Sequence, residues 1–307
     1  MPLVTSKEML LAALEGRFAV GAFNANNMEQ IQAIVDAAVE EQSPVILQVS
    51  QGAIRYAGLE FATAMVKAAA NEANVPVVLH LDHGTDFDQN VRCLRAGFTS
   101  LMFDGSKLPF EENVAVTARI AQIAHVVGIP VEAELGKVLQ AADGVSDEDV
   151  KAAMTQPGLA AEFISRTGCD SLAVAIGSVH AMQNAAAELD IARLKELRAA
   201  VPDVPFVLHG SSGVKESSEV EAIGYGIAKI NVATMLNQAF TAALREALAA
   251  DPKSSDPRKF LLSARDAVKE VVRHKMRLFG SSGQVTAGGY RTGKTVHRSA
   301  NIGGTEE

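Results

Sequence analysis

The sequence predicts an α/β protein built as a closed (β/α)8 TIM barrel, and three observations support this fold class. Eight short apolar runs recur between residues 18 and 232, each followed by a segment with helical spacing. The runs are rich in Val, Ile and Leu without polar alternation, which is typical of parallel strands buried on both faces. The first run ends in Gly21-Ala22-Phe23-Asn24, which lacks the G-x-G-x-x-G turn expected of an open doubly wound sheet.

Turn residues bound the predicted strands, and amphipathic segments separate them. Proline directly precedes several runs, including those that begin at Val45 and Phe206. After Asn27, apolar residues at positions 31, 34, 35 and 38 have the i, i+3, i+4, i+7 spacing of a helix. The eight strands are expected at Phe18–Phe23, Val45–Val49, Val77–Leu81, Ser100–Phe103, Val131–Glu134, Ser171–Ile176, Phe206–Leu208 and Ile227–Val232.

Two segments interrupt the strand–helix rhythm. Gly136–Glu148 is a polar, glycine-containing insertion after the fifth strand, and loops of this length are often lids over active sites. Residues 280–307 are rich in Gly, Ser and Thr and are expected to be a flexible tail. Residues 1–279 are therefore predicted to form one barrel domain, which includes a C-terminal helical extension.

Composition excludes several classes of protein. The chain has 307 residues, 48% hydrophobic and 21% charged, with a formal net charge of −8. An acidic chain is a poor nucleic-acid or anionic-membrane binder, and apolar residues are too plentiful for a disordered protein. No stretch approaches the ~20 apolar residues of a membrane span. The two cysteines, Cys93 and Cys169, have no C-x-x-C spacing, and the N-terminus has no apolar signal core, so a cytoplasmic location is expected.

A polar residue follows every predicted strand. In a (β/α)8 barrel the active site lies at the carboxyl ends of the strands, so these side chains should meet. Each taken alone has an ordinary explanation as a helix cap or loop residue. The set is Asn24, Ser50, Asp82 with His83, Asp104, Glu134, His180, His209 and Asn231.

Three of these residues indicate a metal site. His83, His180 and His209 follow the third, sixth and seventh strands. A single buried histidine is usually a core residue, but three that converge favour zinc with an open position for substrate. His80 precedes His83 by three residues on a strand, so the two side chains point to opposite faces and should not share one ion.

The neighbouring carboxylates leave alternatives open. Asp82 is either a general acid or base or a partner that orients a histidine ligand. Asp104 and Glu134 could hold a second cation or could satisfy hydrogen bonds within the site.

The last two strands predict a phosphate site. The glycines of the segment 209–213, HGSSG, permit close approach of a ligand to backbone N–H groups. The segment 231–234, NVAT, leads into a helix expected to begin near Met235, whose N-terminus favours an anion. Barrels often bind phosphate at this place, between the seventh and eighth strands.

These motifs resemble the class II, zinc-dependent fructose/tagatose-bisphosphate aldolase family. The matches run in order from about residue 19 to 234, and DPRKF at 256–260 extends them. The NVAT segment is more similar to the tagatose-bisphosphate branch than to the fructose-bisphosphate branch. The matching motifs are GAFNANN, SPVILQVSQGA, HLDHGT, AGFTSLMFDGS, VEAELG, DSLAVAIGSVH, VLHGSSG and AKINVAT.

The resemblance implies reversible cleavage of a ketose 1,6-bisphosphate to dihydroxyacetone phosphate and glyceraldehyde 3-phosphate. It implies that the three histidines hold the catalytic Zn²⁺, that Asp82 is the proton donor, and that Asp104 and Glu134 belong to a second divalent metal site. A monovalent cation, Na⁺ or K⁺, is implied near the phosphate. The residues implied to bind dihydroxyacetone phosphate are Ala181, Gly210, Ser211, Ser212, Asn231, Val232, Ala233 and Thr234; Asn24 and Ser50 complete the substrate-binding set.

The chain departs from the family pattern in the lid and beside one ligand. Ala181 stands where the family has glycine, and the stretch from His180 to Asp190 lacks the usual Gly/Lys/Pro pattern. Ala141-Ala142 occupy the place of the lid glutamate, which leaves Asp143 as the nearest carboxylate.

Two alternatives remain at this point. A Schiff-base aldolase would use a buried lysine, and Lys229 is the only lysine inside a predicted strand. A non-catalytic sugar-phosphate-binding paralogue would explain the missing lid glutamate.

The second phosphate of the substrate needs a cation, yet no Lys or Arg cluster stands near a predicted strand end. The resemblance implies that Arg258 reaches the active site of a neighbouring subunit, in a homodimer or homotetramer.

Overall fold

The computed structural model describes residues 3–140, 144, 146–180, 187–286, 289–291 and 296–297. Its centre is an eight-stranded sheet in the order β3-β2-β1-β10-β9-β7-β5-β4, and every pair within it is parallel. A parallel bridge between His80 and Ser100 joins β3 to β4 and closes the ring. The strands are β1 (Val20–Asn24), β2 (Val45–Ser50), β3 (Val77–Asp82), β4 (Leu101–Phe103), β5 (Val131–Leu135), β7 (Ser171–Val174), β9 (Phe206–Leu208) and β10 (Ile227–Val232).

The predicted barrel and all eight predicted strands are confirmed, with small differences at several strand ends, of which the largest are in the first and sixth strands. The first strand begins at Val20 because the N–H groups of Phe18 and Ala19 bond to carbonyls of Ala13 and Phe279 instead of a neighbouring strand. The sixth predicted strand ends at Val174, since the N–H of Ala175 donates to the hydroxyl of Thr155.

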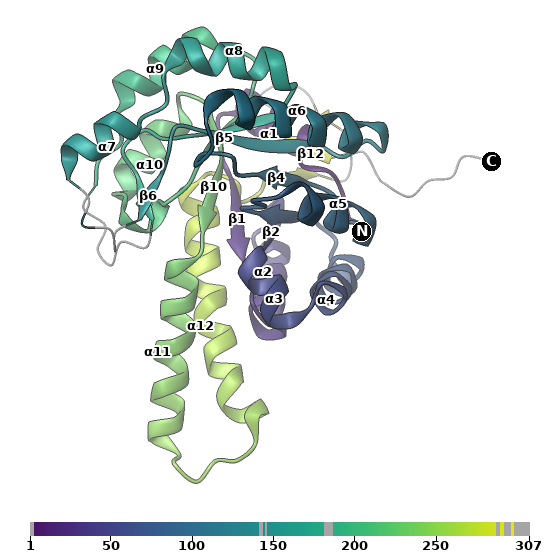
Figure 1. The fold of residues 1–307 in the computed structure, drawn as a ribbon. Helices are drawn as coiled ribbons and strands as arrows, with labels where there is room; N and C mark the ends of the chain where they lie inside the picture. The colour runs from purple at the N-terminus through teal and green to yellow at the C-terminus, as the bar shows by residue number, and fades with distance from the viewer. Residues whose placement is uncertain are drawn as a thin grey trace.

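Helices surround the barrel (Figure 1), and α1 closes its amino-terminal end. Met9 and Leu10 of α1 pack against inward-facing strand residues such as Val20 and Ile46, so α1 fills the amino-terminal end of the barrel. The helices are α1 (Ser6–Gly16), α2 (Met28–Glu40), α3 (Gln51–Ala57), α4 (Leu59–Glu72), α5 (Phe87–Ala96), α6 (Phe110–Val126), α7 (Asp147–Ala153), α8 (Pro157–Thr167), α9 (Ile191–Ala200), α10 (Glu216–Ile223), α11 (Thr234–Ala250) and α12 (Pro257–Leu278).

The C-terminal extension is a hairpin of α11 and α12 that projects from the barrel beside α2 (Figure 1). Asp256 caps α12 by accepting a hydrogen bond from the N–H of Arg258. The turn between the two helices lies at the end farthest from the barrel (Figure 1). Arg258, the second residue of α12, is therefore carried away from the strand ends of its own chain.

Two short sheets accompany the barrel. In the insertion after β5, β6 (Leu139–Gln140) pairs in parallel with β8 (Val179–His180). In the tail, β11 (Val285–Thr286), β12 (Gly289–Arg291) and β13 (Val296–His297) form an antiparallel sheet that composition did not predict. The N–H groups of Gly283 and Val285 bond to carbonyls at the end of α2. No helix among the described residues is both long and apolar enough to cross a bilayer.

Candidate active site

A cavity of about 630 Å³ lies at the carboxyl ends of the strands. Asn24, Ser50 and Asp82 reach it directly from the ends of β1, β2 and β3, and Ser50 also caps α3. The cavity is lined by most of the predicted site residues. Its predicted lining residues are Asn24, Ser50, Asp82, His83, Asp104, Glu134, His180, Gly210, Ser211, Ser212, Asn231, Ala233 and Thr234.

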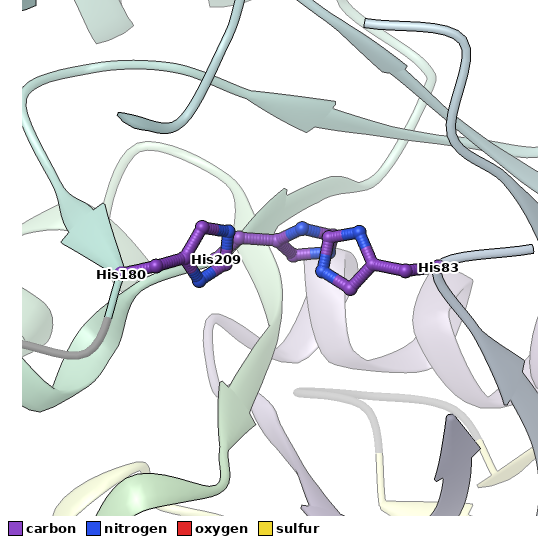
Figure 2. A group of neighbouring side chains, drawn as sticks. All are labelled: His83, His180 and His209. Carbon is purple, nitrogen blue, oxygen red and sulfur yellow. The ribbon is translucent and has the colours of Figure 1, made fainter. Parts of the chain in front are cut away.

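The three histidines converge at this cavity (Figure 2). One ring nitrogen from each lies within 4.8 Å of the others, and the ring centroids of His83 and His209 are 4.7 Å apart. His83 follows β3 with a φ of 49°, a left-handed conformation that is uncommon outside glycine and often found at functional sites. His180 lies in β8 rather than at the end of β7, so its position depends on the pairing with β6.

Two buried atoms at this place lack hydrogen-bond partners among the described residues. They are Nδ1 of His209 and Oε2 of Glu134, which lie 3.1 Å apart without hydrogen-bonding geometry. A buried polar atom without a partner is costly, and a metal ion is one group that would satisfy both atoms. Together with the three converging imidazoles, these atoms make a donor set that fits zinc.

Asp104 orients His83. Its Oδ2 accepts a hydrogen bond from Nδ1 of His83 at 2.8 Å, which leaves Nε2 of the ring to face the cavity. A carboxylate behind a histidine ligand is the usual arrangement in zinc proteins. His83, Asp104 and Glu134 also bring ligand atoms within 4.8 Å of one another, which makes them a second group of candidate donors.

The metal-free histidines differ in pKa because their surroundings differ. Burial alone would lower the pKa of His83, but the carboxylates of Asp82 and Asp104 outweigh burial and raise it to about 10. Burial, with the positive charge of His209, lowers the pKa of His180 to about 3. Burial would also lower the pKa of His209, but its hydrogen bond to Glu132 contributes to raising it. His83 and His209 must therefore each lose a proton before they can bind a metal.

Asp82 is buried and fixed by two amides. Its Oδ2 accepts a hydrogen bond from Nδ2 of Asn24 at 2.7 Å, and its Oδ1 accepts one from Nδ2 of Asn231 at 3.3 Å. Burial alone would raise the pKa of Asp82, but the charges of His83 and His209 lower it. Asp82 is therefore an ionised carboxylate that lines the cavity and can accept a proton.

Gly210 brings the segment 209–213 against the strand that carries His180. Its φ is +68°, and a Cβ there would meet the carbonyl carbon of Val179 at 2.9 Å and the nitrogen of His180 at 3.1 Å. Only glycine fits both the conformation and the space. The hydroxyl of Ser211 bonds to the carbonyl of Asn231, which holds this segment beside the first residues of α11.

Sequence reasoning missed a set of buried charges beneath the cavity. Glu132 accepts a hydrogen bond from His209 at 3.0 Å and pairs with Lys229 at 2.9 Å. The spacing along the strands could have indicated this set. Glu132 stands two residues before Glu134 and Lys229 two before Asn231, so each pair shares one face of a strand. His80 also faces Glu132 and hydrogen-bonds to Ser100, apart from the three converging histidines.

The structure departs from some expectations about the site. The sequence showed no Lys or Arg cluster near a strand end, but the single lysines Lys107 and Lys137 line the cavity from the loops after β4 and β5. Val232 does not line the cavity, because its side chain is 1% exposed and packs in the hydrophobic core. The side chain of Arg258 is 89% exposed and pairs with Asp256 in the α11–α12 hairpin. The predicted residues Ala181 and Asp143 lie outside the described part of the chain.

Comparison with known proteins identifies close relatives. The family model for class II fructose-bisphosphate aldolase matches residues 4–284. The chain is 48% identical to a fructose-bisphosphate aldolase of Geobacillus stearothermophilus over 287 residues, which cover 92% of this chain and 99% of that protein. It is 46% identical to a fructose-bisphosphate aldolase of Thermus caldophilus, with the same coverage of each chain.

A solved structure shares the fold. The crystal structure of the YdjI aldolase from Escherichia coli K12 superimposes with a TM-score of 0.81 at 37% sequence identity. The match covers 92% of this chain and all of the YdjI chain.

Proposed function

The chain belongs to the class II fructose-bisphosphate aldolase family, and from that premise we propose that it is a zinc-dependent ketose-1,6-bisphosphate aldolase. The reaction is the reversible cleavage of fructose or tagatose 1,6-bisphosphate to dihydroxyacetone phosphate and glyceraldehyde 3-phosphate. One observation carries the metal dependence, namely the convergence of three histidines beside buried ligand atoms without partners among the described residues.

We assign the zinc ligands to His83, His180 and His209. Zinc supplies Lewis-acid stabilisation of the negative charge that develops when the carbon–carbon bond breaks. Asp104 and Glu134 are the donors for a second divalent ion. A monovalent cation, Na⁺ or K⁺, belongs near the phosphate-binding segments.

Asp82 is the proposed proton-transfer group. Its carboxylate takes the proton of the C4 hydroxyl, so that the C4 oxygen becomes a carbonyl as the C3–C4 bond breaks. The electron pair of that bond passes to the dihydroxyacetone phosphate half, which then gains a proton at C3. We propose that Asp143 of the lid supplies this second proton.

The phosphate of the dihydroxyacetone half is proposed to sit between the segment 210–212 and the start of α11. Both segments line the cavity, and α11 begins at Thr234 with its backbone N–H groups unpaired by the helix itself. Ala181 and the backbone of Asn231, Val232 and Ala233 complete the proposed set for this phosphate. Asn24 and Ser50 are proposed to bind substrate from the ends of β1 and β2, and β1 lies beside β10.

Two sources of positive charge are available for the other phosphate. We propose that Arg258 of a second subunit binds this phosphate. The α11–α12 hairpin carries Arg258 away from the cavity of its own subunit, and a guanidinium binds phosphate in a bidentate manner. The minimum active unit would then be a homodimer, or a homotetramer built from dimers. If Lys137→Ala raises KM for the bisphosphate and Arg258→Ala does not, the cations of the same subunit perform this role instead.

The proposed location is the cytoplasm. Cys93 and Cys169 are both free and buried, as expected in a reducing compartment.

The proposal is tested by cleavage kinetics on paired fructose and tagatose 1,6-bisphosphates, with and without zinc after chelation. We expect cleavage to stop on chelation and return with zinc. His209→Ala should lose zinc and nearly all cleavage. His125→Ala, on α6 and bonded to Asp170, should retain both. Full activity after exhaustive chelation, with borohydride trapping of a lysine, would identify a Schiff-base aldolase instead. Absence of turnover on every ketose bisphosphate would identify a binding protein.

A further inference from the structure

Lys229 is an unusual residue for the interior of a barrel. It lies in β10, is 1% exposed, and does not line the cavity. Burying an ammonium group is costly unless partners surround it. Lys229 has two, because its Nζ lies 2.9 Å from Oε2 of Glu132 and donates to Oδ1 of Asn231 at 2.8 Å. Each partner leads to a different functional group of the site.

The first path leads to the metal ligands. Glu132 accepts a hydrogen bond from Nε2 of His209 at 3.0 Å through its other oxygen, Oε1. When the ring is neutral, donation from Nε2 leaves the lone pair on Nδ1 of His209, and Nδ1 is the buried atom without a partner among the described residues. Lys229 holds the Glu132 carboxylate from the opposite side. The ion pair therefore fixes which nitrogen of His209 is offered to a metal.

The second path leads to Asp82. Because the carboxamide oxygen of Asn231 accepts from Lys229, the amide nitrogen must point the other way, where it donates to Oδ1 of Asp82 at 3.3 Å. Replacing the ammonium by a group that cannot donate removes the reason for this orientation. The amide could then turn and present an oxygen to the Asp82 carboxylate, which would repel it.

We infer that Lys229 is a positioning residue that couples the metal ligand His209 to the proton-transfer carboxylate Asp82. The inference rests on the proposed function. Lys229 touches neither substrate nor metal and acts only through Glu132 and Asn231. One substitution at this position should consequently change two separable properties, zinc affinity and the turnover of enzyme saturated with zinc.

The test compares Lys229→Met with Lys275→Met. Lys275 is a matched control, since it is 2% exposed and its Nζ lies 2.8 Å from Oε2 of the buried Glu219, but it belongs to α12 outside the cavity. Zinc affinity is measured by competition with a chromogenic chelator, which does not require activity. We expect Lys229→Met to bind zinc ~10–100-fold more weakly than wild type, and Lys275→Met to bind it as wild type does.

Turnover at saturating zinc separates the second path from the first. We expect Lys229→Met to lower kcat by ~10-fold or more even when zinc-loaded, with KM changed little. Glu132→Gln should lower zinc affinity while leaving kcat at saturating zinc closer to wild type. In the double variant with Asp82→Asn, Lys229→Met should cause little further loss of kcat, because it acts through Asp82.

Unchanged zinc affinity together with unchanged kcat in Lys229→Met would overturn the inference, as would equal losses in Lys275→Met. If Lys229→Met does not fold, Lys229→Gln removes the charge but keeps a donor. Zinc affinity should then fall while kcat at saturating zinc stays closer to wild type, and unchanged zinc affinity in this variant would overturn the inference. Failure of the wild type to bind zinc would instead overturn the proposed function, so the two outcomes are distinguishable.

Discussion

Replacing Gly210 by alanine tests whether close packing of the segment 209–213 maintains the metal site. The added Cβ would sit 2.9–3.1 Å from backbone atoms of Val179 and His180, which cannot rotate away as a flexible side chain could. Gly168 provides a matched control. It has the same φ of +68° and ends α8, and a Cβ added there would meet no atom within 4 Å.

Both substitutions place alanine in an unfavourable backbone conformation, and only Gly210→Ala also overpacks its surroundings. A left-handed conformation costs an alanine ~1–2 kcal/mol at either position. Overpacking adds a further ~1–3 kcal/mol only at Gly210. At ~2–4 °C per kcal/mol, Tm of the zinc-free protein should fall by ~4 °C for Gly168→Ala and by ~10 °C for Gly210→Ala.

Zinc affinity gives an independent measurement. Because the atoms displaced by Gly210→Ala belong to the strand that carries His180, zinc binding should weaken by ~10–100-fold, whereas Gly168→Ala should leave it unchanged. Thermal unfolding followed by circular dichroism and chelator competition measure the two effects. Equal losses of Tm in both variants, with wild-type zinc affinity in Gly210→Ala, would refute the reasoning.

Four further outcomes are expected. Asp82→Asn should keep its zinc but lower kcat by ~10²–10⁴-fold; a loss of zinc instead would mean that Asp82 orients a ligand. Since the pKa of His83 is about 10 without metal and that of His209 is also raised, zinc must displace protons from the site. Zinc affinity should therefore rise with pH below 10, and calorimetry at pH 8 in buffers of different ionisation enthalpy should detect proton release on zinc binding. Arg258→Ala should weaken bisphosphate turnover but not dihydroxyacetone phosphate binding, and mixing it with His209→Ala should restore activity if subunits exchange; mixed subunits without activity would contradict a shared site. Asp143→Ala should slow proton exchange on dihydroxyacetone phosphate, which NMR in deuterated solvent measures, and an unchanged rate would assign that proton to another group.

The sequence was most informative where one physical rule governs many residues. Strands buried on both faces must be continuous apolar runs, so the barrel could be predicted from Val45–Val49 and its counterparts. Carboxyl ends of parallel strands meet, so the residues directly after them, such as Asn24, Asp82 and His209, could be assigned to one site from their positions along the chain.

Prediction failed where position depends on the path of a loop. Lys107 and Lys137 reach the cavity from loops whose course no local pattern encodes. Glu132 was missed and Lys229 was considered only as a Schiff-base lysine for a different reason: the role of a charged residue inside an apolar run cannot be inferred until its partner on another strand is known. The pairing of β6 with β8 likewise joins segments about forty residues apart, and spacing alone does not suggest it.

That pairing constrains how this scaffold can change its substrate. Gln140 is the register partner of His180, so a strand within the insertion at 136–148 also supports one of the three converging histidines. Grafting a foreign insertion onto the barrel should therefore preserve Leu139 and Gln140 and exchange only residues beyond them. Loop libraries that begin at Gly136 would alter metal occupancy and specificity together, and variants selected for a new aldehyde would be lost through weak zinc binding rather than through poor recognition.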